Sequence, residues 1–172
     1  MKVSIGTVQV ALWRYVGVWS IVVVAFALQR YAYDLLLAGP WPGVVYLRWS
    51  LIQWGAWAAL APTVFRLAER RPLSTPLNWP SLALHVAASL GVTLAALVAG
   101  ALVSTLFEPS GFAEQFKYFV AQHAATGLLT YWALVAIHHA LHYQAEKARR
   151  EVEASRLATE LGEIVRDVKA AA

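Results

Sequence analysis

The chain has no cysteine and few charged residues, and both absences narrow what it can be. Without cysteine, it forms neither disulfides nor thiolate metal sites. Charged residues make up 14% of the 172 residues, against about 25% in an ordinary soluble domain. Hydrophobic residues make up 59%, and the mean hydropathy is +0.53. The composition therefore predicts an integral membrane protein whose basic residues act as topology signals and do not contact nucleic acid.

The sequence motifs of soluble enzymes are missing as well. The sequence has no phosphate-binding glycine-rich loop, no nucleophile elbow and no pair of histidines with an intervening glutamate. The first residues lack a compact signal peptide with a small-residue cleavage site, so we expect them to belong to the first helix. Candidate functional residues are therefore the ionisable side chains within apolar segments.

Four apolar segments are each close to the length of about 20 residues that crosses a bilayer. They lie roughly at 13–37, 44–65, 82–107 and 118–143. Basic residues precede the first segment and follow the second and the fourth, which places both termini in the cytoplasm. We predict an all-α protein, a four-transmembrane-helix bundle in the bacterial cytoplasmic (inner) membrane, whose last helix extends into a cytoplasmic coiled coil.

The last helix changes character after Gln144, where charged residues become frequent. We therefore expect a four-helix transmembrane sensor domain over 1–144 and a cytoplasmic signalling helix over 145–172. Small or apolar residues recur there at alternating spacings of four and three, with a shift of register between Ser155 and Leu157. This pattern favours a parallel homodimeric coiled coil over a solvated amphipathic tail. The predicted seam contains Leu141, Ala145, Ala148, Val152, Leu157, Leu161, Ile164 and Val168.

Histidines gather where the fourth segment ends. His138 and His142 are four residues apart and share a helix face, and we expect His85 to lie at a similar depth. Such histidines could ligate a metal or a haem, but we favour hydrogen bonds to headgroups, loop carbonyls or arginines. His123 is isolated in its segment and is expected to be a helix-packing residue. We predict no metal and no cofactor, with haem kept as an alternative.

Two further patterns concern the first and third segments. Arg30 and Asp34 are one helical turn apart and are expected to form an ion pair. The pair could serve as a signal input, but we favour simple pairing at the membrane interface. Small residues recur every fourth position in the third segment, and we expect this stripe to pack against another helix, with an internal contact favoured over a dimer contact. The stripe contains Ala87, Gly91, Ala95 and Ala99.

Three runs of sequence carry a family resemblance: ALAPTVFRLAERRPL, NWPSLALHVAASL and LLTYWALVAIHHALHYQAEKARREVEASRLATEL. Together they resemble the membrane region of LytS/YehU/AlgZ-type sensor histidine kinases. The resemblance implies a membrane domain followed by a charged helix, a phosphoacceptor segment, an ATP-binding domain and a partner response regulator. This sequence has neither the phosphoacceptor segment nor the ATP-binding domain, so we expect no catalytic residue and no enzyme activity in it.

These observations predict a sensory and signal-transmitting module that passes a stimulus through its fourth helix to a dimeric coiled coil. The expected partners are a second copy of the chain, membrane lipid and, through the resemblance, a kinase domain. The connections are too short for a separate ligand-binding domain, so the stimulus acts in the membrane, at its outer surface or through another membrane protein. The alternatives are a haem- or quinone-binding protein that uses the histidines named above, and a membrane anchor without a ligand.

Overall fold

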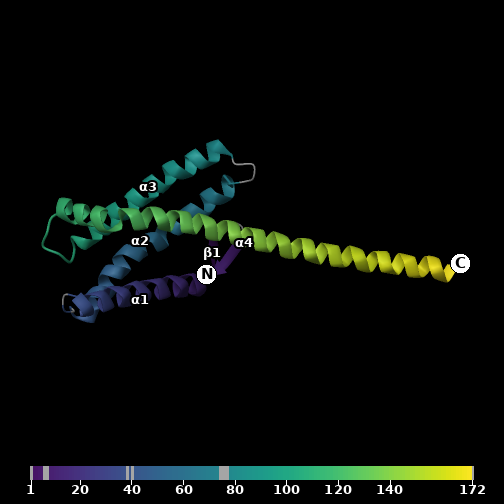
Figure 1. The fold of residues 1–172 in the computed structure, drawn as a ribbon, viewed down its shortest axis with the longest axis horizontal. Helices are drawn as coiled ribbons and strands as arrows, with labels where there is room; N and C mark the ends of the chain where they lie inside the picture. Colours follow the sequence, from purple (N-terminus) through teal and green to yellow (C-terminus); the bar gives the residue numbers. More distant parts are fainter. Residues whose placement is uncertain (1, 6–7, 38, 40, 74–77, 172) are drawn as a thin grey trace. The chain divides into compact units, whose positions relative to one another are not determined.

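Four helices and a short hairpin form the chain in a computed structural model (Figure 1). The structure describes residues 2–5, 8–37, 39, 41–73 and 78–171. The elements are β1 (Lys2–Ile5), β2 (Val8–Ala11), α1 (Leu12–Leu37), α2 (Gly43–Arg70), α3 (Trp79–Ser104) and α4 (Phe112–Ala171). The chain divides into two compact units, Met1–Val135 and Ala136–Ala172, so the division falls before the composition change at Gln144. Each unit is described by itself below.

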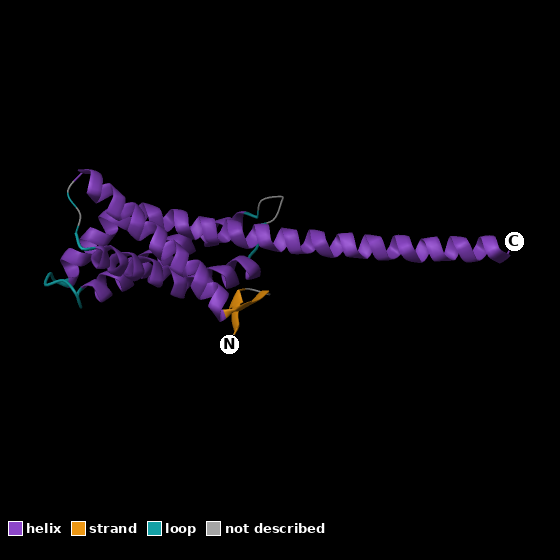
Figure 2. Cartoon of the chain, turned by 90° about the horizontal axis from the view of Figure 1, so that it is seen from below, coloured by secondary structure: helices purple, strands orange, loops and turns teal. Residues whose placement is uncertain are grey.

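The two strands before Leu12 form a hairpin. We had expected this part of the chain to belong to the first helix, and that expectation was wrong. Strands β1 and β2 pair antiparallel, with Lys2 opposite Ala11 and Ile5 opposite Val8 (Figure 2). Polar and apolar residues alternate in β1 and through the first three residues of β2, which is the period of a β-strand and not of a helix. The hairpin contacts α1 and α2. It therefore adds a short strand pair to a chain whose other elements are the four predicted helices.

Three of the four helices are long and apolar enough to cross a membrane: α1, α3 and the part of α4 within Phe112–Gly162. Helix α2 has 28 residues, but it includes Arg48, Pro62, Arg66 and Glu69 and is less apolar. It contacts both α1 and α3, and it has eight buried residues, whereas α1 has two. A helix that packs against protein on several sides exposes fewer positions to the surroundings, so it needs fewer apolar residues.

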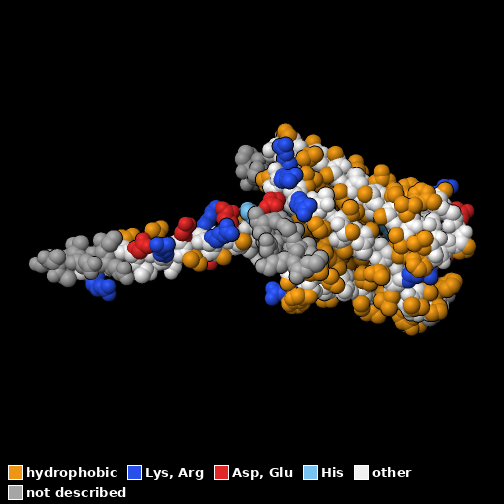
Figure 3. Space-filling model, turned by 180° about the vertical axis from the view of Figure 1, so that it is seen from behind, with side chains coloured by type: hydrophobic (Ala, Val, Ile, Leu, Met, Phe, Trp, Pro, Cys, Tyr) orange, Lys and Arg blue, Asp and Glu red, His pale blue; other side chains and the backbone are white. Residues whose placement is uncertain are grey.

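The first unit has an apolar exterior and many polar residues inside. Large apolar side chains such as Val16, Ile21 and Leu28 are exposed on α1. Figure 3 shows hydrophobic side chains spread over this unit, with charged side chains in a few groups on it and along the C-terminal helix. The buried polar residues are Asp34, Ser50, Ser81, His85, Ser89, Thr93 and Ser104. Water-soluble proteins show the opposite distribution, so the first unit has the surface that a lipid environment favours.

The small-residue stripe of the third segment does not make the internal contact that we had favoured. Ala87, Gly91 and Ala95 are exposed, and nothing lies within 4 Å of a Cβ built on Gly91. The buried face of α3 is instead a polar stripe with four-residue spacing, made of Ser81, His85, Ser89 and Thr93. Polar side chains are poorly solvated by lipid and turn toward protein, whereas small apolar ones can face either way.

Helices α3 and α4 approach each other closely at two glycines. A Cβ built on Gly100 would lie 2.3 Å from a ring carbon of Phe119. One built on Gly127 would lie 2.6 Å from the Thr93 methyl group. Two apolar clusters pack these helices. The smaller contains Leu97, Ala101 and Phe119, and the main core includes Trp54, Trp57, Ala61, Val64, Phe65, Ala96, Tyr131, Leu134 and Val135. The core fixes α4 against α2 and α3 within the first unit.

Candidate functional site

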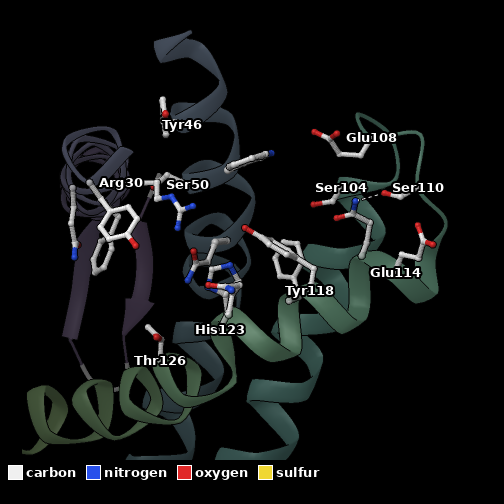
Figure 4. A pocket seen from close by; sticks show the side chains of 18 residues that line it. Arg30, Tyr46, Ser50, Ser104, Glu108, Ser110, Glu114, Tyr118, His123 and Thr126 are labelled. Carbon is white, nitrogen blue, oxygen red and sulfur yellow. Dashed lines mark hydrogen bonds between the residues drawn. The ribbon is translucent and has the colours of Figure 1, made fainter. Parts of the chain in front are cut away.

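A cavity of about 580 Å³ lies at the end of the first unit where α1 connects to α2 and α3 connects to α4 (Figure 4). Its walls come from α1, α2, α4, the end of α3 and the α3–α4 connection. Its volume falls in the range of about 300–1,000 Å³ that small-molecule sites occupy. The cavity is lined by six aromatic side chains, which are Phe26, Tyr33, Tyr46, Trp49, Tyr118 and Phe119. This cavity is the candidate ligand site.

Polar groups differ between the two ends of the cavity, which we call the rim, beside the α3–α4 connection, and the floor, farther along the helices. The α3–α4 connection and the first turn of α4 contribute Glu108 and Glu114 at the rim. The carboxamides of Gln29, Gln53 and Gln122 lie farther along α1, α2 and α4, as does His123. Arg30 and His123 point toward the same space from α1 and α4 (Figure 4). The site therefore combines an acidic rim with a floor that can donate and accept hydrogen bonds.

The predicted ion pair between Arg30 and Asp34 is present, and its arginine lines the cavity. The Arg30 Nε lies 3.4 Å from the Asp34 Oδ1, and the Asp34 side chain is buried. The Tyr46 hydroxyl donates a hydrogen bond of 2.9 Å to the Asp34 Oδ2 and accepts one of 3.0 Å from the Trp41 N–H. These contacts join α1 to the start of α2. They also give each of these buried polar groups a hydrogen-bond partner.

A second ion pair, which the sequence did not suggest, joins α2 to the α3–α4 connection. The Arg48 Nη2 lies 2.7 Å from the Glu108 Oε1, and the Arg48 guanidinium lies over the Phe107 ring at 5.3 Å. The two residues of the pair are 60 positions apart in the chain, so no local spacing indicates it. One ion pair at the cavity thus lies within α1, and the other joins α2 to the α3–α4 connection.

His85 is fully buried, and both of its ring nitrogens are hydrogen-bonded. Its Nε2 lies 2.9 Å from the Arg71 carbonyl oxygen and its Nδ1 lies 2.8 Å from the Tyr131 hydroxyl. A carbonyl oxygen only accepts, so Nε2 donates to it and the tyrosine hydroxyl donates to Nδ1. Ligation of a haem or a metal would break one of these buried bonds. The geometry favours the structural role of His85, which joins α3 to α4 and to the residue that follows α2.

His123 belongs to the first unit and lines the cavity, whereas His138 and His142 belong to the second unit. The rings of His138 and His142 are parallel within 6°, with centroids 6.4 Å apart, so they do share a helix face. Among the residues that the structure describes, no group of three or more His, Cys, Asp or Glu side chains could hold a metal ion. The structure places His85 in the first unit with its own partners, and His138 and His142 in the second.

The predicted coiled-coil positions lie on a continuous helix. Leu141, Val152, Leu157 and Leu161 expose more than half of their surface, and Ala145 and Ala148 are exposed as well. The side chains of Ile164 and Val168 lie outside the described residues. Ion pairs with four-residue spacing follow the same segment: Glu146 with Arg150, Lys147 with Glu151, and Arg156 with Glu160. Such pairs stabilise an exposed helix by a few tenths of a kcal/mol each, about 0.2–0.5.

No protein-family model, curated protein or solved structure matches the chain. Of the predicted site residues, Arg30 lines the cavity and Asp34 supports it. Gln29, Gln53 and Gln122 line the cavity and were not predicted. Carboxamides within apolar segments are a usable signal of a site, because exposing such groups to lipid costs free energy.

Proposed function

We propose that this chain is the membrane-embedded sensory and signal-transmitting module of a two-component sensor histidine kinase. The resemblance to LytS/YehU/AlgZ-type kinases supports this function, as do the three long apolar helices and the apolar exterior of the first unit. In the parent protein, the dimeric module would act on a kinase domain and its response regulator. The cavity would be the site of signal input.

We further propose that all four helices cross the bacterial inner membrane and that both termini are cytoplasmic. Arg66, Arg70 and Arg71 follow α2, and Lys147, Arg149 and Arg150 lie within α4. Basic segments concentrate on the cytoplasmic side, and these two clusters share that side with Lys2 and Arg14, near the N-terminus, only if α2 also crosses. In this topology the α1–α2 and α3–α4 connections, and the cavity between them, lie at the outer face.

One observation carries the proposal: the helix that lines the cavity is also the helix that bears the predicted dimer seam. Helix α4 contributes Tyr118, Phe119, Gln122, His123 and Thr126 to the cavity, and it continues without a break to Ala171. A stimulus that favours one arrangement of the cavity walls would bias the same helix farther along its length. The register shift between Ser155 and Leu157 supplies a place where two packings lie close in free energy.

Two insertions between Arg156 and Leu157 test this transmission. The register shift is two residues, so inserting five helix-forming residues completes the seven-residue repeat, whereas inserting seven preserves the shift. Residues 1–172 are fused to the cytoplasmic part of a dimeric histidine kinase, and autophosphorylation is compared with and without the cavity-filling substitution Gln53→Trp. We expect this substitution to change kinase activity in the seven-residue variant and to have no effect in the five-residue variant.

The same comparison separates the proposal from its alternatives. If Gln53→Trp leaves kinase activity unchanged even without an insertion, the membrane unit is an anchor and not a sensor. If both insertions respond alike, the register shift does not transmit the signal. The haem alternative loses support at His85, because both nitrogens of that ring already have partners.

A further inference from the structure

The charges of the cavity lining and of its ion-pair partners do not balance, because Arg30, Glu108 and Glu114 line the cavity and only the first two have ion-pair partners among the described residues. Arg30 is paired with Asp34 and Arg48 with Glu108, so each pair is neutral. Glu114 also lines the cavity, and within the described part of the chain its carboxylate has no ion-pair or hydrogen-bond partner. The sum over these five groups is two positive and three negative charges, a net charge of −1. The uncompensated charge is at the rim, on the first turn of α4.

Aromatic rings line the same cavity as this carboxylate. Tyr118 is four residues after Glu114, so both side chains lie on the cavity face of α4. Trp49 and Tyr33 line the cavity from α2 and α1. The face of an aromatic ring attracts a cation, and the attraction increases when the cation is removed from water. A carboxylate beside such rings is the usual chemistry of a site for an organic ammonium group.

The floor of the cavity differs from the rim and suits a neutral part of the ligand. Gln53, Gln122 and His123 offer neutral hydrogen-bond donors and acceptors, and Phe26 and Phe119 add apolar surface. Arg30 contributes a cation at this depth, but its Nε is bonded to the buried Asp34, which offsets its charge. The cavity is thus suited to a molecule with one positive charge and an apolar body, with its far end neutral.

We propose that this cavity binds a small organic cation, an amine with an aromatic or apolar body, whose ammonium group lies beside Glu114 and Tyr118. The role of this amine as the stimulus rests on the proposed function. Its binding does not, because binding is measured on the chain without any output domain. Failure of the amine to bind would leave the insertion experiment unaffected, and failure of the insertion experiment would leave binding unaffected.

Three probes of nearly equal shape and different charge test the proposal at pH 7. Phenylethylamine is a cation, 2-phenylethanol is neutral and phenylacetate is an anion. Each is titrated calorimetrically into the full chain in mild detergent. We expect the amine to bind about tenfold more tightly than either of the others, the difference that a carboxylate and aromatic faces give in a partly desolvated site.

Two matched substitutions on α4 assign the effect to one carboxylate. Glu114→Gln should weaken amine binding about tenfold and leave 2-phenylethanol unchanged, because only the charged probe uses the carboxylate. Glu153→Gln makes the same change of charge on the same helix, at an exposed position that does not line the cavity, and should change neither affinity. The three probes on the unsubstituted chain test the proposal even if Glu114→Gln does not fold.

Three results would overturn the proposal. The first is equal affinity for the amine and the alcohol, which would mean that the charge is not recognised. The second is a preference for phenylacetate that Arg30→Gln abolishes, which would assign the cavity to an anion. The third is the absence of binding by all three probes. Tighter binding of the amine that depends on Glu114 supports it.

Discussion

At the scale of single residues, the first unit satisfies its buried polar groups through contacts between helices. The Ser50 hydroxyl donates to the Val23 carbonyl at 2.7 Å, and the Tyr15 hydroxyl donates to the Ala58 carbonyl. Together with the partners of Asp34 and His85, these bonds give directional contacts between helices whose exteriors are apolar. In lipid, such bonds do not compete with water, so they contribute to the specificity of helix packing.

The hydroxyl of Tyr46 is the most informative single group to remove. We predict that Tyr46→Phe lowers the free energy of unfolding by about 1–3 kcal/mol, because the buried Asp34 carboxylate loses a donor and the Trp41 N–H loses an acceptor. Unfolding in detergent mixtures of increasing denaturing strength measures the change.

Tyr33→Phe is the matched control for Tyr46→Phe. Tyr33 also lines the cavity, but its side chain is exposed and its hydroxyl makes no hydrogen bond with another described residue. We expect its loss to change the free energy of unfolding by less than about 0.5 kcal/mol. Equal effects of the two substitutions would show that the Asp34 network does not stabilise the fold.

Local spacing predicted part of this residue-scale picture. The four-residue spacing of Arg30 and Asp34 indicated their ion pair, and the face shared by His138 and His142 followed in the same way. The side-chain partners of His85 and Arg48 could not be predicted from local spacing. They lie 46 and 60 positions away, and these contacts depend on how the helices pack. The sequence alone therefore could not distinguish a structural role of a buried His85 from a role as a ligand.

At the scale of elements, the contact between α3 and α4 depends on two positions without a side chain. Gly127 faces Thr93, and Gly100 faces Phe119. Close approach of backbones strengthens van der Waals contact between membrane helices, which is why small residues recur at their interfaces. Helix α4 is held there in the same part of the chain that lines the cavity.

We predict that Gly127→Ala destabilises the first unit by about 1–3 kcal/mol, because the added Cβ would lie 2.6 Å from the Thr93 methyl group and the helices must separate. The unfolding transition in detergent measures the loss. Gly91→Ala is the control on α3, since nothing lies within 4 Å of its Cβ. That change should leave stability equal or higher, because alanine favours a helix by about 1 kcal/mol over glycine. A neutral Gly127→Ala would contradict the close contact.

Hydropathy located the helices but did not orient them about their axes. The four predicted segments correspond to α1, α2, α3 and α4, whereas the internal contact favoured for Ala87, Gly91 and Ala95 was wrong. In a soluble protein an apolar face marks the core, but a lipid-facing helix can be apolar on every side. The buried face of α3 was indicated instead by its polar residues, Ser81, His85, Ser89 and Thr93.

At the scale of the whole molecule, the continuous helix α4 would join the proposed input site to the proposed output helix. The cavity belongs to the first unit, and the exposed seam at Leu141, Val152, Leu157 and Leu161 belongs to the second. Helix α4 takes part in both. A single copy leaves the seam exposed, and a second copy of the chain would cover it as a parallel coiled coil, which is the arrangement that kinase signalling by a dimer requires.

Cysteine cross-linking along α4 tests this central claim most directly, because the chain has no cysteine of its own. Single cysteines are placed at successive positions from 141 to 161 in the unsubstituted chain, in Gln53→Trp and in the exposed-position control Leu94→Trp. Disulfide-linked dimers are then measured in native membranes. We predict strong cross-linking at Leu141, Ala145, Ala148 and Val152, and a changed ratio between Leu157 and Val152 in Gln53→Trp alone. Absence of cross-links, or identical patterns with the cavity filled and open, would contradict the account.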